Sequence, residues 1–280
     1  MARSNQKSQR LLIISKETNL YVIKRLKSAG KKDFDKVDVL RYRDIKISNT
    51  EKEVVTIAGK PLSYYTHIIS RVADKHYMLR YFLALEAKRL NIRMLNREAI
   101  IQMPIYNKAY QLYKFSISGI PLPKTEFSYK KELITIKPPL LKKRIDGRLS
   151  RGIKKIEGLG DNSHSDFQES IFQSFLVNDF DYRILIMDGK LIGAVERSSR
   201  YSDNKTESRA CDISEDSLEV KLAKKVALCM NLEYVGVDVM KAGREAFVLE
   251  ANIDAGIKGF ERVTKKDLAS MIIQQVLDEK

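Results

Sequence analysis

The pattern of hydrophobic and polar positions changes along the chain, from strands that alternate with helices to strands that follow one another in hairpins. Short apolar runs predict strands, and apolar positions three or four residues apart predict helices. Before residue 105 the predicted strands are residues 11–15, 37–40, 54–57, 66–71 and 92–96, and the predicted helices are residues 18–29, 77–90 and 98–103. Strands that alternate with helices are typical of an open α/β sheet.

After residue 105 the pattern favours antiparallel sheets. The predicted helices are residues 107–118, 167–172, 218–230 and 264–277, and the predicted strands are residues 133–136, 139–143, 184–187, 191–196, 235–239 and 247–251. Asp188-Gly189, between two of these strands, is a strong signal for a tight hairpin turn. The polar stretch 158–166 is predicted to be a linker.

The hairpin predicted at residues 235–252 carries the chemistry that stands out most. Valines at alternate positions lead to a turn at 241–244, and an apolar run follows on the second strand. Glu250 and Asn252 are two residues apart on that strand, so both side chains leave the same face. Asp238 on the partner strand can lie opposite them. Two carboxylates and an amide oxygen on one face form the all-oxygen site that hard cations such as Mg²⁺ prefer.

The alternative is an edge hairpin whose polar residues simply face solvent, because acidic residues are common on such hairpins. One observation favours the metal site. Glu250 directly follows the apolar run 247–249 in a strand that is expected to be buried. A buried carboxylate needs a partner, and a cation supplies one.

This hairpin resembles the metal-binding strands of the ATP-grasp superfamily, and closely those of its RimK-type ligases. The matching residues are Gly236-Val237-Asp238, Glu250-Ala251-Asn252, Gly256 and Gly259-Phe260-Glu261. The family has small residues and proline after the asparagine, whereas this chain has Ile253-Asp254-Ala255. The resemblance extends over residues 11–277 and implies that Asp238, Glu250 and Asn252 bind Mg²⁺, with Mn²⁺ as an alternative.

A second match lies in residues 139–153. Pro139, Lys143, Gly147, Gly152 and Ile153 fit the family spacing without a gap. Glycines let a hairpin loop fold over phosphates with its backbone N–H groups pointing inward, and a lysine adds a point charge. The resemblance therefore implies that Lys143, Gly147 and Gly152 bind ATP, and that Lys143 takes part in catalysis.

Two features near this loop leave questions open. Lys137 is a rival for the phosphate lysine, although it lacks the spacing to Gly147. Arg148 and Arg151 stand where the family has glycine and small polar residues, so the loop is expected to be stiffer and more cationic than usual.

Other roles come from the resemblance alone. Lys108 matches a lysine on the nucleotide phosphates, and Asp181 matches a ribose ligand. Gln173, Ser174 and Phe175 match a hinge whose backbone reads the adenine edge, a role that needs no particular side chain. Arg183 is implied as a catalytic group on the transferring phosphoryl oxygens. In the stretch 197–212 the loop pattern of the family is missing, and Lys205 and Arg209 are the cations nearest to the missing residues. Ser70-Arg71-Val72, at the end of a predicted strand, also resembles the N-terminal lobe of the family. The alternatives are a solvated helix lysine for Lys108, a turn residue for Asp181 and a surface cation for Arg71.

Composition narrows the remaining choices. The 280 residues are 44% hydrophobic, which suffices for one large core or for two to three smaller ones. No apolar run approaches the ~20 residues of a membrane span, and the N-terminus lacks the apolar segment of a secretory signal. The cysteines Cys211 and Cys229 and the scattered histidines show no metal-binding spacing. We therefore expect a cytoplasmic protein with no membrane partner.

The net charge of +15 indicates anionic partners. Its lysines and arginines are spread along the chain, and no zinc finger or ribonucleoprotein motif is present, so nucleic acid is not expected to be the main partner. The charge instead favours an acidic amino-acid or peptide substrate. Asp254 opposes this choice because it stands near the acceptor position of the family, although Lys258 and Arg262 are close enough in sequence to neutralise it.

Together these observations predict an α+β, three-lobed ATP-grasp fold. The expected parts are a disordered tail at 1–10, an α/β N-terminal lobe at 11–105, a central lobe at 106–184 and a C-terminal lobe at 185–280, with the last two clamping ATP between antiparallel sheets. The resemblance implies an ATP-dependent carboxylate–amine ligase that forms an amide through an acyl phosphate and adds an acidic amino acid such as glutamate to an acceptor. The alternative is a non-catalytic nucleotide- or nucleic-acid-binding protein on a degenerate scaffold. Whether the chain forms homo-oligomers stays open.

Overall fold

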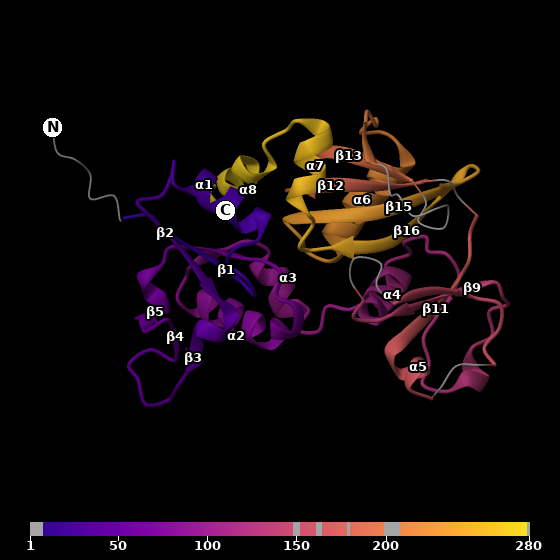
Figure 1. The fold of residues 1–280 in the computed structure, drawn as a ribbon, viewed down its shortest axis with the longest axis horizontal. Coiled ribbons are helices and arrows are strands. Elements are labelled where there is room, and N and C mark those ends of the chain that lie inside the picture. Colours follow the sequence, from indigo (N-terminus) through magenta and orange to yellow (C-terminus); the bar gives the residue numbers. More distant parts are fainter. Residues whose placement is uncertain (1–7, 148–151, 161–163, 178–179, 199–207, 279–280) are drawn as a thin grey trace. The chain divides into compact units, whose positions relative to one another are not determined.

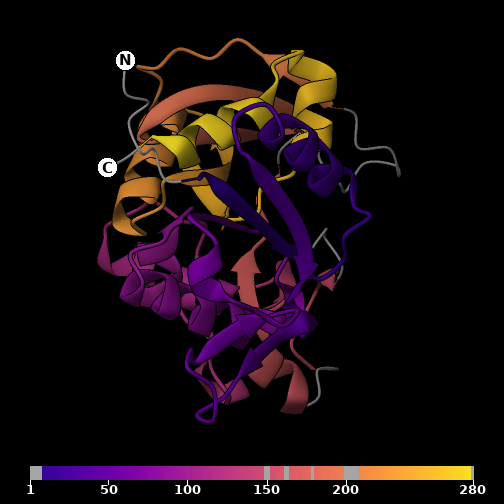
Figure 2. The same cartoon turned by 90° about the vertical axis from the view of Figure 1, so that its left-hand side faces the viewer.

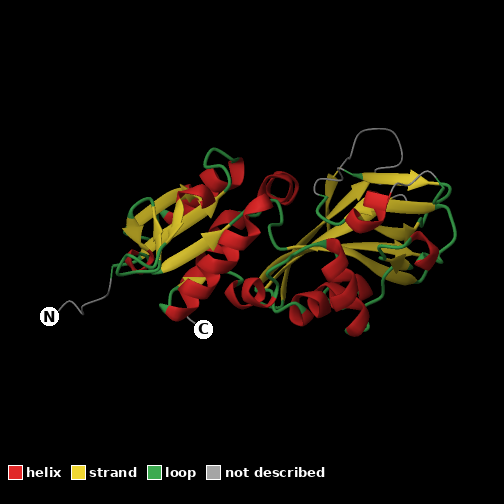
Figure 3. Cartoon of the chain, turned by 90° about the horizontal axis from the view of Figure 1, so that it is seen from below, coloured by secondary structure: helices red, strands yellow, loops and turns green. Residues whose placement is uncertain are grey.

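The computed structural model describes residues 8–147, 152–160, 164–177, 180–198 and 208–278. The chain divides into two compact units. The first unit comprises Met1–Pro104, Asn231–Tyr234 and Asp254–Lys280, and the second comprises Ile105–Met230 and Val235–Ile253. Both units mix helices with strands (Figure 3), which confirms the predicted α+β class.

The first unit is built on a parallel sheet with the strand order β2-β1-β6-β7. Its strands are β1 (Arg10–Ser15), β2 (Lys36–Arg41), β6 (His67–Ser70) and β7 (Arg93–Met94). Residues 11–14 of β1 are completely buried, as their unbroken apolar run predicts. Gly30, at the end of helix α1 (Tyr21–Gly30), lies so close to β1 that a Cβ there would be 3.0 Å from Leu11 Cδ2.

Helices cover this sheet. The helix α8 (Leu268–Leu277) packs beside α1, as Figures 1 and 2 show from two directions. The other helices of the unit are α2 (Tyr77–Arg89), α3 (Arg97–Gln102) and α7 (Ile257–Thr264). The helix predicted over 264–277 is confirmed at 268–277 but not over its first four residues. Lys265 takes a left-handed conformation that ends α7, and Asp267 starts α8 by accepting a hydrogen bond from Ser270 N at 3.0 Å.

A small antiparallel sheet, β3-β4-β5, completes the first unit. Its strands are β3 (Ile45–Ile47), β4 (Val55–Ile57) and β5 (Lys60–Pro61), and short 3₁₀ helices stand at η1 (Tyr42–Asp44), η2 (Leu62–Tyr64) and η3 (Asp74–His76).

The second unit begins with helix α4 (Lys108–Ile117) and an antiparallel sheet of order β10-β9-β11-β8. The strands are β8 (Thr125–Glu126), β9 (Leu140–Arg144), β10 (Ile153–Ile156) and β11 (Ser170–Ser174), with helix α5 at His164–Glu169. The predicted helix over 167–172 is wrong in its second half, where β11 begins. The strand predicted at 133–136 is also wrong: a 3₁₀ turn, η4 (Lys131–Leu133), is followed by residues whose N–H groups donate to the Glu126 carboxylate instead of to a strand.

A second sheet in this unit has the order β14-β13-β12-β15-β16. Its strands are β12 (Phe180–Met187), β13 (Lys190–Ser198), β14 (Ser208–Cys211), β15 (Tyr234–Ala242) and β16 (Glu245–Asn252), and helix α6 (Leu218–Cys229) packs on it. The two hairpins predicted from Asp188-Gly189 and from 241–244 are both present. The lobe boundary predicted at 184 falls inside β12, and the division into three lobes stays a prediction. Within the described residues, no helix is long and apolar enough to cross a membrane.

Candidate active site

The hairpin of β15 and β16 brings the predicted metal ligands together. Val239 pairs with Val248, and the next pair is Asp238 with Glu250, so Leu249 has no partner in the ladder. This bulge places Asp238 directly across from Glu250, on one face of the sheet. Asn252 pairs with Gly236 and leaves the same face of β16 as Glu250. The predicted arrangement of these side chains is therefore confirmed in register.

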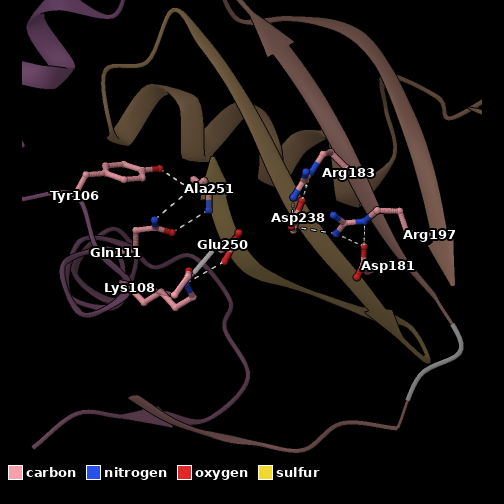
Figure 4. A network of polar contacts seen from close by, with 10 residues as sticks. Tyr106, Lys108, Gln111, Asp181, Arg183, Arg197, Asp238, Glu250 and Ala251 are labelled. Carbon is pink, nitrogen blue, oxygen red and sulfur yellow. Dashed lines mark hydrogen bonds and ion pairs between the residues drawn. The ribbon is translucent and has the colours of Figure 1, made fainter. Parts of the chain in front are cut away.

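Asp238 is buried and bound by two arginines (Figure 4). Arg183 on β12 donates from Nε and Nη2 to the two carboxylate oxygens, both at 2.7 Å. Arg197 Nη2 lies 3.0 Å from Asp238 Oδ2. Burial alone would raise the pKa of Asp238, but the two guanidinium groups outweigh it and hold the pKa well below its usual range. Asp238 is thus ionised throughout the physiological range.

Arg197 is a site residue that the sequence analysis assigned to a polar loop. In the structure it belongs to β13, is buried, and pairs in register with Asp181 on β12. Its Nε donates to Asp181 Oδ1 at 2.6 Å. Asp181, predicted as a ribose ligand, therefore shares Arg197 with Asp238, and the two arginines and two aspartates form one ionic network (Figure 4).

Lys108 stands beside Glu250. Asn107 caps the start of α4 by accepting a hydrogen bond from Tyr110 N at 2.8 Å, which makes Lys108 the first helical residue. Its Nζ lies 3.6 Å from Glu250 Oε2 and donates to the carbonyl oxygen of Gly147. The side chain is only 12% exposed, so Lys108 is not the solvated helix lysine that was its alternative.

Lys143 on β9 is the second cation predicted for the phosphates. It is buried, and Nζ donates to Gln173 Oε1 at 2.5 Å, while Gln173 Nε2 donates to Thr125 Oγ1 at 2.9 Å. Burial lowers the pKa of Lys143 to about 8, with the charge of Lys108 adding to the effect and the charges of Glu250, Asp238 and Asp181 opposing it. These influences locate Lys143 in the same charged cluster. Its rival Lys137 is exposed.

The predicted phosphate loop is only partly described. Gly147 N donates to Arg144 O in a tight turn, and Gly152 adopts a φ of +77°, where a Cβ would lie 2.7 Å from Arg144 Cδ. The positive φ and the lack of room for a Cβ both explain why position 152 is a glycine. Arg144 itself pairs with Asp146 and Glu169. Residues 148–151, with Arg148 and Arg151, and the predicted ligand Lys205 lie outside the described residues.

The predicted adenine hinge is Gln173, Ser174 and Phe175. The side chain of Gln173 holds Lys143. Ser174 N donates to Lys124 O at 2.8 Å and Phe175 N donates to Pro139 O at 3.0 Å. Both N–H groups are therefore used within the protein, and the role of this segment toward adenine stays a prediction.

The donor set fits Mg²⁺. No group of three or more histidine, cysteine or acidic side chains within the described residues is placed to hold a metal ion. Mg²⁺ does not need one, because it is typically held by one or two carboxylates together with substrate phosphates and water. Asp238 and Glu250 are such a pair, and the buried Nδ2 of Asn252 beside them has no hydrogen-bond partner. A metal ion would take the amide oxygen of Asn252, whereas its Nδ2 is a donor that a phosphate oxygen of the nucleotide would satisfy.

The cluster as a whole suits a polyphosphate. Lys108, Lys143 and Arg183 surround Asp238 and Glu250, so the site offers cations for phosphate oxygens next to carboxylates for a metal. A cavity of about 20 Å³, lined by Lys108, Gln111, Gln173 and Leu249 among others, lies beside these lysines and has room for about one water molecule.

Comparison with known proteins identifies the family and the fold. Residues 132–276, more than half of the chain, match the family model of the RimK-like ATP-grasp domain. A relative from Pseudoalteromonas atlantica described as a probable alpha-L-glutamate ligase 2 is 27% identical over 296 residues, covering 96% of this chain and 95% of the relative.

Solved structures with the same fold are more distant in sequence. The ATP-grasp ligase PsnB, complexed with a minimal precursor, Mg and ADP, superposes with a TM-score of 0.72 at 16% identity over 95% of this chain and 96% of PsnB. The macrocyclase MdnC of Microcystis aeruginosa, bound with the precursor peptide MdnA, gives a TM-score of 0.70 at 14% identity over 95% of this chain and 99% of MdnC. These similarities confirm the predicted fold.

Proposed function

We propose that this chain, which belongs to the RimK-like ATP-grasp family and is an ATP-dependent carboxylate–amine ligase, adds glutamate or another acidic amino acid to a peptide, protein or small-molecule acceptor. The observation that carries the proposal is the pairing of Asp238 with Glu250 next to Lys108, Lys143 and Arg183. A metal–phosphate site would explain why these carboxylates and cations gather in one place.

The reaction consists of two displacements. A carboxylate oxygen of the acceptor attacks the γ-phosphoryl group of ATP, which gives an acyl phosphate and releases ADP. The amine of the incoming amino acid then attacks the acyl carbon, the C–O bond to phosphate breaks, and an amide and inorganic phosphate result, with one proton lost from the amine. The first step needs charge neutralisation more than acid–base groups.

The residues of this chain supply that neutralisation. Lys108 and Lys143 would hold phosphate oxygens as point charges, and Arg183 would face the transferring group while Asp238 fixes its guanidinium. Asp238, Glu250 and Asn252 would hold Mg²⁺, which would polarise the phosphate oxygens when bound. Asp181 and the backbone of 173–175 would contact the nucleoside.

Three observations support an acidic amino acid. Curated relatives are described as probable alpha-L-glutamate ligases. The net charge of +15 attracts anions. Asp254, which would repel an acidic substrate, is neutralised by Arg80: Nη1 lies 3.1 Å from Asp254 Oδ2 and Nη2 lies 3.2 Å from Oδ1.

Solved neighbours that hold precursor peptides support a peptide acceptor. The free cysteines Cys211 and Cys229 fit a reducing compartment such as the cytoplasm.

The test is ADP release from Mg-ATP across a panel of peptide and small carboxylate acceptors, with glutamate, aspartate or lysine as the amine. We expect turnover with glutamate, identified by mass spectrometry as an amide product, and none with Glu250→Gln. Turnover that requires lysine, with glutamate inert, would contradict the acidic substrate while leaving the ligase chemistry intact.

A further inference from the structure

Arg71, in the first unit, is a buried cation that forms no ion pair with the residues that the structure describes. It follows β6 directly, and its N–H donates to Ile14 O at 2.8 Å, which extends the ladder with β1. The residue is 1% exposed. Nη2 donates to Ala255 O at 2.7 Å, and the guanidinium lies 5.6 Å from the ring centre of Tyr234. Nε and Nη1 are buried and have no hydrogen-bond partner.

This arrangement is unfavourable for a residue with only a structural role. An arginine side chain carries five N–H donors and keeps its charge at every accessible pH. A buried charge normally has both an ionic partner and hydrogen bonds for its remaining protons. Among the described residues no carboxylate lies within ion-pair distance of Arg71, so the partner has to come from elsewhere.

The neighbouring charges do not supply it. The nearest acid in sequence to the Ala255 carbonyl is Asp254, and Asp254 is bound by both nitrogens of the Arg80 fork. Arg80 also donates to Ser70 O, next to Arg71, at 3.2 Å. Burial raises the pKa of Tyr42 to about 12, and the charges of Arg80 and Arg71 oppose this rise while the charge of Asp254 adds to it.

A second unpartnered polar group lies at the same edge of the sheet. Ser15 ends β1, is completely buried, and its Oγ has no hydrogen-bond partner. Ile14 pairs with Ser70, so Ser15 stands one step further along, opposite Arg71 on the neighbouring strand. Residues at equal positions on paired strands project to the same face. Both lie at the carboxyl ends of parallel strands, where open α/β sheets bind ligands.

We infer that Arg71 and Ser15 form a binding site for a carboxylate of a small ligand, such as a free amino acid or a dicarboxylate. A planar guanidinium fork matches a carboxylate with two parallel hydrogen bonds, and a serine hydroxyl supplies a third donor. The site rests on the unpartnered donors of Arg71 and Ser15 and stands independently of the proposed function.

Calorimetry on the full chain tests the site without turnover. Glutamate, glutarate and inorganic phosphate are titrated into wild type, with and without a non-hydrolysable ATP analogue. We expect glutamate and glutarate to bind and Arg71→Met to abolish that binding. The variant Arg71→Lys keeps the charge but loses the fork, so it should weaken binding by about tenfold or more. Arg43→Met, at an exposed arginine of the same unit, is the matched control and should bind as wild type does.

Stability gives a second readout. Ser15→Ala removes a buried donor that has no partner, so it should not lower the melting temperature in the absence of ligand. Glutarate should raise the melting temperature of wild type but not of Arg71→Met. If Arg71→Met does not fold, Arg71→Lys carries the test alone. Three outcomes would each overturn the inference. A folded Arg71 variant binds glutamate and glutarate as wild type does, wild type binds no carboxylate, or wild type binds only phosphate. If the ligase assay gave no product with any amine, the calorimetric result would still decide whether Arg71 and Ser15 bind a carboxylate. If calorimetry showed no binding, the ligase assay would still decide the proposed function.

Discussion

Gln111 on α4 holds the backbone of Ala251 on β16 through both atoms of its side-chain amide. Gln111 Oε1 accepts a hydrogen bond from Ala251 N at 2.8 Å, and Nε2 donates to Ala251 O at 3.1 Å. Tyr106 donates its hydroxyl to the same carbonyl (Figure 4). Because β16 ends the order of its sheet, its outer backbone groups need partners, and the glutamine takes the place of a neighbouring strand. Ala251 separates Glu250 from Asn252, so this contact orients both predicted metal ligands.

Gln111→Leu should therefore weaken metal binding more than it weakens the fold. The leucine keeps the volume but leaves Ala251 N–H without a partner, which should lower the free energy of unfolding by about 1–3 kcal/mol. Loss of orientation in a metal site typically lowers affinity or activity about 10–100-fold. The measurement is kcat against Mg²⁺ concentration at saturating ATP, where the half-saturating Mg²⁺ concentration should rise.

Two variants bracket this result. Tyr106→Phe removes one of the two donors to Ala251 O and should show a smaller shift in the same direction. Gln274→Leu changes an exposed glutamine of the first unit and should leave the Mg²⁺ dependence unchanged. A destabilised Gln111→Leu with wild-type kcat and Mg²⁺ dependence would mean that the contact supports only the fold.

Glu250 and Asp238 should respond differently to the loss of charge. Glu250 has one cation, Lys108, at 3.6 Å, and its side chain is 29% exposed. Glu250→Gln should therefore abolish turnover while the free energy of unfolding changes by less than about 1 kcal/mol. Asp238→Asn leaves Arg183 and Arg197 without their shared carboxylate and should destabilise the protein by about 3–5 kcal/mol. Urea unfolding and ADP release measure the two effects. Undiminished ADP release in Glu250→Gln would assign Glu250 a structural role only.

The sequence predicted the hairpin, but it could not predict the register that makes it a site. Counting back from the turn at 242–245 pairs Val239 with Val248 and would then place Leu249 opposite Asp238. The bulge at Leu249 shifts the register by one residue, and such a shift moves a side chain to the other face of the sheet. Nothing in the local pattern marks Leu249 as the unpaired residue, because an apolar residue is equally at home in a regular strand.

Arg197 was missed for the same physical reason. Counting from the Asp188-Gly189 turn pairs Asp181 with Glu196, and only the irregularity between Leu185 and Ile186 brings Arg197 opposite Asp181. Gly193, which lies on the partner strand at this irregularity, was the one available signal. The pairing of Asp254 with Arg80 was beyond sequence reasoning as well, because 174 residues separate them. Lys258, proposed as a neutralising neighbour, lies over the ring of Tyr21.

Lys143, and not Lys137, should determine ATP affinity. Lys143 is buried in the charged cluster, whereas Lys137 is exposed. Lys143→Ala removes a charge-assisted contact worth about 1.5–3 kcal/mol, or roughly 10–100-fold in affinity. Lys137→Ala, the matched control, should change affinity and stability by less than about 0.5 kcal/mol. Calorimetry with Mg-ATP decides between them. A larger loss of affinity at Lys137 would require a different alignment of the phosphate loop.

The same lysine predicts how activity depends on pH. Burial lowers the pKa of Lys143 from 10.5 to about 8, so the free enzyme loses this cation as the pH rises through about 8. Because kcat/KM reports ionisations of the free enzyme, kcat/KM for ATP should fall above pH 8, approaching about tenfold per pH unit. Lys143→Arg keeps its charge and should show no such fall, even if its kcat/KM at pH 7 is lower.

Stability should follow the opposite course. Between pH 8 and 10.5 the unfolded chain, in which Lys143 has its ordinary pKa, binds more protons than the folded protein does. The contribution of Lys143 to the free energy of unfolding therefore rises with pH across this window. Lys143→Met, which has no proton to lose, removes this contribution, so its free energy of unfolding should rise less than that of wild type between pH 8 and 10. Two results together would show that another group titrates near pH 8. The fall in kcat/KM would persist in Lys143→Arg, and the free energy of unfolding would depend on pH in the same way in wild type and Lys143→Met.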